Sequence, residues 1–122
     1  MMNFLVIFIG GGLGSLCRYG ISKISLSLFS GDFPLGTFIS NTLSCIILAG
    51  SVLWFSGKVG TSEMVKLFLI TGFCGGFSTF STFSFETFEL LKSGNFLIAI
   101  LNILISVIVG VGLIYFLLKN QG

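Results

Sequence analysis

Residues 71–86 read TGFCGGFSTFSTFSFE, and this stretch decides the fold of the chain. It lies inside an apolar segment that is long enough to cross a bilayer. Hydrocarbon offers no water to an unpaired N–H or C=O group, so an irregular backbone is costly there. Glycine-rich backbone at this depth is therefore expected only where it is buried in protein or lines a polar path. Phenylalanines three residues apart, beside hydroxyls, predict a membrane protein that passes a small solute through its middle.

The composition supports a membrane protein and argues against an enzyme. Of the 122 residues, 54% are hydrophobic and only 8% are charged, whereas a soluble domain is about one quarter charged. There are no histidines and only four acidic residues, which leaves few groups for acid–base catalysis or a transition-metal site. The net charge of +2 is too small to indicate a nucleic-acid partner. We expect a multi-pass protein of the cell membrane, in contact with the lipid bilayer.

Four apolar segments predict an all-α membrane protein that forms one domain over residues 1–122. Each segment has the roughly 20 residues that a helix needs to cross the hydrocarbon core. The third helix is expected to be broken at its Gly-rich segment. The expected spans are residues 3–29, 34–55, 63–91 and 95–118.

Three connections join these segments. The first is a turn at residues 31–34, which ends in a proline suited to a helix start. The second covers residues 56–63, where Thr61 or Ser62 is expected to cap the next helix. The third, residues 92–94, is so short that the third and fourth segments must be antiparallel neighbours.

The basic residues do not decide the orientation in the membrane. With four crossings, the first segment begins and the fourth segment ends on the same side of the membrane. The positive-inside rule then compares the Lys and Arg residues of the loops on the two sides. The count is three against three: Lys58, Lys66 and Lys119 against Arg18, Lys23 and Lys92. Two interpretations stay open, namely insertion in both directions with pairing as an antiparallel dimer, or one orientation set by a weak signal.

Polar residues inside the spans follow helical stripes. Thr37, Asn41 and Ser44 share one face of the second segment, and the fourth segment repeats the spacing with Asn95, Asn102, Ser106 and Gly110. Such residues either bond helices together or line a polar path. For Asn41 and the hydroxyls of the third segment we favour the path.

Small residues and one arginine mark the first segment. Gly10 and Gly14 form a small-xxx-small pattern, as do Gly72 and Gly76, which is typical of close helix packing. Arg18 follows one turn later and either extends to the membrane interface or holds an anion at a vestibule.

With these features in view, the chain resembles the Fluc (CrcB) fluoride channels of microbes. The matching passages are GGLGSLCRY at 11–19, PLGTFISN at 34–41, the stretch 72–86, and the serine and glycines of the fourth segment. The resemblance covers nearly the whole chain, and the third passage is highly specific. This sequence departs from the family at Asn102, where an aromatic hydroxyl is frequent, and at Gly110, where a further hydroxyl is common.

The resemblance implies a passive, fluoride-selective channel that exports cytoplasmic fluoride. It also implies a dual-topology antiparallel homodimer with two pores, although some members pair with a related chain. By family analogy Asn41, Phe80 and Phe83 line the pore, polar tracks contain Ser81, Thr82 and Ser106, and Arg18 lies toward the vestibule. A structural sodium ion (Na+) is expected at the dimer centre, held by the backbone carbonyls of Gly75 and Ser78.

Two other functions are weighed against this one. A small dual-topology multidrug exporter also has four short helices, but it needs a membrane-embedded carboxylate in the first helix, and no acidic residue precedes Asp32. A non-conducting membrane subunit that packs against a partner is the other alternative.

Overall fold

The computed structural model describes residues 1–56 and 62–120, and the regular elements within them are all helices. The third span consists of several consecutive pieces and runs over Glu63–Lys92. All four spans are long and apolar enough to cross a membrane, which confirms the prediction of an all-α protein with four membrane-spanning helices. In chain order the elements are α1 (Met2–Leu28), α2 (Leu35–Ser56), α3 (Glu63–Lys66), the π-helix η1 (Leu67–Cys74), α4 (Gly75–Phe77), α5 (Phe80–Lys92) and α6 (Phe96–Leu118).

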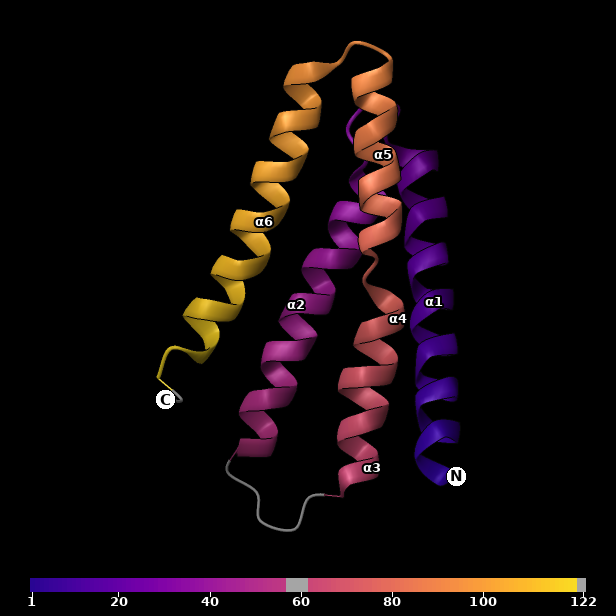
Figure 1. Cartoon of the computed structure of the whole chain (residues 1–122), viewed down its shortest axis with the longest axis vertical. Coiled ribbons are helices and arrows are strands. Elements are labelled where there is room, and N and C mark those ends of the chain that lie inside the picture. Colours follow the sequence, from indigo (N-terminus) through magenta and orange to yellow (C-terminus); the bar gives the residue numbers. More distant parts are fainter. Residues whose placement is uncertain (57–61, 121–122) are drawn as a thin grey trace.

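The spans alternate in direction, so that α1 begins and α6 ends at the same end of the molecule (Figure 1). Helix α1 packs along η1 and α4, and α2 contacts both α1 and α6. Helix α6 meets the third span mainly through α5, and it leans away from α3 at the other end (Figure 1). The α1 side of the bundle is therefore closely packed, and α6 is held mainly by α2 and α5.

The distribution of side chains is the reverse of that in a soluble protein. Large apolar residues face outward along α6, where Leu97 is 70% and Val111 is 63% exposed. The residues that are fully enclosed are small or polar, with Ser40 at 0% and Asn102 at 1%. An apolar surface of this extent is stable against lipid and not against water. The helices are thus joined by small and polar side chains, as is usual between membrane helices.

The closest helix contact joins α1 to η1 and α4 through glycines. A methyl group built on Gly10 would lie 2.6 Å from the Phe68 carbonyl oxygen, and one on Gly76 would meet the backbone of Gly11. Because the obstructing atoms belong to backbone, no side-chain rotation could make room for a larger residue. The prediction that these small residues form a helix-packing face is confirmed.

The third span is interrupted within the stretch 71–86, at its hydroxyl residues and not at its glycines. Helix α4 ends at Phe77, and Ser78 and Thr79 have extended backbone, with ψ of 157° and 116°. The glycines before them are helical and lie in η1 or α4. Helix α5 then begins at Phe80, with the Thr79 hydroxyl accepting a 3.1 Å hydrogen bond from the Thr82 amide as its N-cap.

The connections follow local chemistry. Helix α2 begins directly after Pro34, and Ser62 caps α3 by accepting a 3.2 Å hydrogen bond from the Met64 amide. The alternative cap Thr61 and the basic residue Lys58 lie outside the described residues. Between α5 and α6, Gly94 has a φ of +88°, a conformation that suits glycine and permits a sharp turn.

We predict that Gly76→Ala destabilises the protein by about 1–3 kcal/mol or more, because the new methyl group meets the backbone of α1. The matched control is Gly12→Ala on α1, where nothing lies within 4 Å of the added methyl. This control should be neutral or stabilising, because alanine favours a helix by about 1 kcal/mol over glycine. Thermal unfolding in detergent, monitored by size-exclusion chromatography, measures the difference in stability between the two variants. Equal stability of the two variants would contradict the close contact.

Candidate functional site

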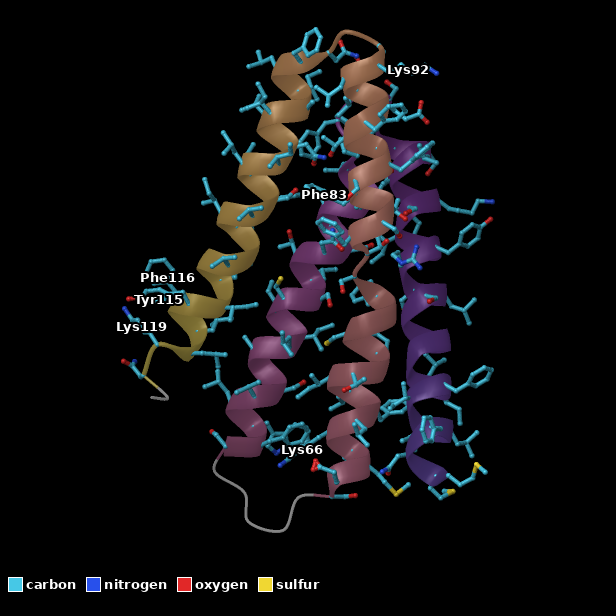
Figure 2. All side chains as sticks on the ribbon, viewed as in Figure 1. Lys66, Phe83, Lys92, Tyr115, Phe116 and Lys119 are labelled. Carbon is cyan, nitrogen blue, oxygen red and sulfur yellow. The ribbon has the colours of Figure 1, made fainter. Side chains whose placement is uncertain are left out.

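A pocket of about 280 Å³ opens where α2, the interruption, α5 and α6 meet. It lies near the middle of the spans, and Phe83 projects from α5 close to the interruption (Figure 2). Five of the residues predicted from the sequence line it together: Asn41, Phe80, Phe83, Ser106 and the predicted sodium ligand Ser78. The lining is completed by Cys45, Thr79 and Val107, and none of the eight lining residues carries a charge.

Asn41 holds the interrupted backbone by pairing both polar groups of one residue. The Thr79 amide donates to Asn41 Oδ1 at 2.8 Å, and Asn41 Nδ2 donates to the Thr79 carbonyl at 3.4 Å. Extended backbone inside a membrane needs such partners, because no water is available to supply them. The sequence analysis predicted Asn41 as a pore residue; the structure adds that its side chain pairs with the backbone of the interruption.

The two predicted aromatic residues differ in exposure. Phe83 is half-buried within the pocket, whereas Phe80 is 80% exposed. Their ring centroids are 6.1 Å apart and the ring planes are tilted by 40°. The Phe80 ring therefore extends the pocket wall beyond the surface of the single chain.

The carbonyls of Gly75 and Ser78 are released from the helical hydrogen-bond ladder. In a continuous helix they would accept from the amides of Thr79 and Thr82. The Thr79 amide instead donates to Asn41, and the Thr82 amide donates to the Thr79 hydroxyl. Gly75 is exposed and Ser78 half-buried. Both carbonyl oxygens are thus available to a hard cation such as sodium, which prefers oxygen ligands.

The carbonyl of Cys74, one residue earlier, has the opposite environment. It accepts from the Ser78 amide at 3.0 Å, from the Ser78 hydroxyl at 2.8 Å and from the Ser44 hydroxyl at 3.0 Å. Three donors leave this oxygen no capacity for an ion. Near the end of α4, the Cys74 carbonyl is therefore fully hydrogen-bonded, whereas the Gly75 and Ser78 carbonyls have lost their helical donors.

Arg18 is half-buried and contacts the interruption from α1. Its Nε donates to the Gly76 carbonyl at 3.1 Å, so this side chain serves the end of α4 and does not lie in a loop. The contact spans 58 residues of sequence and depends on the close glycine packing of α1. A vestibule role for Arg18 remains a prediction.

The remaining predicted residues lie outside the pocket. Thr82 lines a separate open hollow of about 550 Å³, together with the carboxylates of Asp32, Glu86 and Glu89. Ser81 is exposed, with its hydroxyl 3.5 Å from that of Thr79. The structure of one chain thus separates these two hydroxyls from Ser106, with which the sequence analysis grouped them.

Thr87, which bonds to the backbone of Phe83, was not found from the sequence. Thr87 donates to the Phe83 carbonyl at 2.8 Å and accepts from Asn102 Nδ2 at 2.9 Å. The sequence analysis placed Asn102 in the polar stripe of the fourth segment and noted it as a departure from the family, but gave it no partner. The sequence contained one indication of this pair: Thr87 follows Phe83 by one helical turn, and Asn102 precedes Ser106 by one turn.

Comparisons with known proteins agree with the resemblance. The family model described as CrcB-like protein, Camphor Resistance (CrcB), matches residues 5–117. A relative from Pyrococcus abyssi is 48% identical over 113 residues, which cover 91% of this chain and 89% of the relative. Relatives from Chloroflexus aurantiacus and Methylobacterium are each 44% identical, over 120 and 114 residues, and cover 93% and 91% of this chain and 95% and 89% of their own lengths. All three relatives are named fluoride-specific ion channel FluC.

We predict that Asn41→Leu destabilises the protein by about 2–5 kcal/mol, because it leaves two backbone groups without partners. Asn41→Asp keeps the acceptor for the Thr79 amide and should cost less. Asn95→Ala is the control, since Asn95 is half-buried near the helix end and its side chain caps nothing. Thermal unfolding gives the order, and hydrogen exchange of the segment around Thr79 should rise in Asn41→Leu alone. Unchanged exchange there would contradict the pairing.

Proposed function

The chain belongs to the CrcB family, and from that membership we propose that it is a passive, fluoride-selective channel through which cytoplasmic fluoride leaves the cell. It is a multi-pass membrane protein, and the family consists of fluoride ion channels and not of enzymes. The observation that carries the proposal is the uncharged pocket at the interruption, where aromatic rings, an amide and a hydroxyl meet.

The chemistry of this pocket suits fluoride. Fluoride is small and holds its water strongly, so a path through the membrane must replace that water with many modest donors. The positive edges of the Phe80 and Phe83 rings, the Asn41 amide and the Ser106 hydroxyl are donors of this kind. A lysine in the same place would hold the anion too tightly, whereas conduction requires sites that release it.

We propose that the working unit is an antiparallel homodimer with two pores. Phe80 is largely exposed in one chain, so a second copy placed against this face could contribute its own ring to the path. Lys66 and Lys119 lie at one end of the molecule and Lys92 at the other (Figure 2), which is consistent with insertion in both directions. A related chain could take the place of the second copy.

A structural sodium ion at the centre of this dimer belongs to the same proposal. The Gly75 and Ser78 carbonyls would hold it, and their loss of helical donors supports that assignment. Sodium would supply positive charge to carbonyl oxygens that lack other partners. Two carbonyls from one chain are too few for a full shell, so a second copy would provide the matching pair.

We predict that purified protein in liposomes releases fluoride rapidly when a potassium ionophore carries the balancing charge. Release should need no proton gradient, because the pocket contains no carboxylate that could carry protons. Chloride-loaded liposomes are the control and should retain their anion. Equal release of chloride, or fluoride release only with a proton gradient, would refute the proposed function. The second outcome would instead support an exporter.

We predict that Phe80→Ile and Phe83→Ile reduce fluoride flux at least about tenfold, because isoleucine has no positive ring edge. The protein should still assemble, since the replacement is apolar and the change in volume is moderate. Phe8→Ile and Phe116→Ile are the matched controls, because these side chains are 78% and 67% exposed and neither lines the pocket. Fluoride efflux at equal protein content measures all four. Equal flux would show that Phe80 and Phe83 only fill space.

A further inference from the structure

A chain of hydrogen bonds connects the pocket to the contact between α5 and α6. The Ser106 hydroxyl lies 3.3 Å from Asn102 Oδ1, Asn102 Nδ2 lies 2.9 Å from Thr87 Oγ1, and that oxygen lies 2.8 Å from the Phe83 carbonyl. Ser106 and Phe83 both line the pocket, whereas Asn102 and Thr87 do not. Asn102 is 1% exposed and Thr87 7%, so protein groups must satisfy both side chains.

The direction of each hydrogen bond in this series follows from the Phe83 carbonyl at its end. A backbone carbonyl can only accept, so the Thr87 hydroxyl donates its single proton to Phe83. Thr87 Oγ1 must then accept from Asn102, which places the amide nitrogen of Asn102 toward α5. The amide oxygen of Asn102 therefore faces Ser106, and Ser106 is the donor.

This direction has a consequence for the pocket. The only hydroxyl proton of Ser106 is directed to Asn102, although Ser106 lines a space that we assign to an anion. To contact the anion, Ser106 must turn its proton away from Asn102 Oδ1. The 3.3 Å separation is long for a bond between a hydroxyl and a carbonyl oxygen, so an anion can displace it. The exchange leaves Asn102 Oδ1 buried without a donor, which is unfavourable.

We propose that Asn102 is a positioning residue that competes with the anion for the Ser106 hydroxyl and so limits how tightly this site holds fluoride. The inference rests on the proposed function and deepens it. When fluoride arrives, Ser106 turns its O–H group toward the ion. When fluoride departs, the same proton returns to Asn102 Oδ1. Asn102 thereby favours release, which a conducting path requires at each of its sites.

The test is the dependence of fluoride efflux on fluoride concentration in liposomes. Asn102→Leu keeps the branching of the side chain but removes the acceptor. Its half-saturating fluoride concentration should fall about fivefold, which is the lower end of the change in affinity expected when a buried acceptor is no longer left unsatisfied. Its maximal rate should fall as well. Thr87→Val is the matched control, because it breaks the other bond of Asn102 and keeps the acceptor for Ser106. Its half-saturating concentration should stay nearly unchanged.

A double-variant comparison separates positioning from general stability. In a Ser106→Ala background, Asn102→Leu should have no further effect on the half-saturating concentration, because no hydroxyl remains to be released. Additive effects, an equal shift in Thr87→Val, or no shift in Asn102→Leu would each overturn the inference. Should Asn102→Leu fail to assemble, Asn102→Ala removes the same acceptor without added volume and is judged by the same criteria.

The unmodified protein separates this inference from the function on which it rests. If it conducts fluoride and the Asn102 variants show no shift, only the role of Asn102 is refuted. If the unmodified protein itself releases no fluoride, both the proposed function and this inference are refuted.

Discussion

Backbone groups at the middle of a bilayer must be paired by the protein, and this requirement governs the arrangement around Ser78 and Thr79. These two residues leave the helical ladder at the midpoint of the third span. The Asn41 side chain on α2 pairs both polar groups of Thr79, and Arg18 on α1 takes the Gly76 carbonyl. The interruption is therefore stable only with α1 and α2 in place, and it draws both helices to the same depth.

The glycine contact between α1 and the third span makes this arrangement possible. Because Gly14 and Gly76 have no side chains, the two backbones approach closely, and Arg18 reaches a carbonyl on the neighbouring helix from one turn further along α1. Larger residues would separate the helices and lengthen that reach. The small residues of the motif thus serve the polar site indirectly, although none of the α1 glycines lines the pocket.

Local sequence features predicted the spans, the turn at Pro34, the Ser62 cap and the glycine packing face, because each depends on residues close together in the chain. The stretch 71–86 also located the candidate site. The sequence did not show that its glycines are helical and that Ser78 and Thr79 form the interruption, since this depends on donors from α1 and α2. The grouping of Ser81 and Thr82 with Ser106 is not seen in one chain, because successive residues of α5 face different sides. The partnership of Thr87 with Asn102 required the packing of α5 against α6.

The interruption also divides the electric dipole of the third span. A continuous helix would carry its partial charges only at its two ends, near the membrane surfaces. The break creates a second pair at mid-depth, with the negative end of α4 facing the Arg18 guanidinium and the positive end of α5 beginning at Phe80, beside the pocket. The backbone amides at the start of α5 therefore direct a partial positive charge toward the pocket in the least polar part of the membrane, where screening by water and salt is weakest.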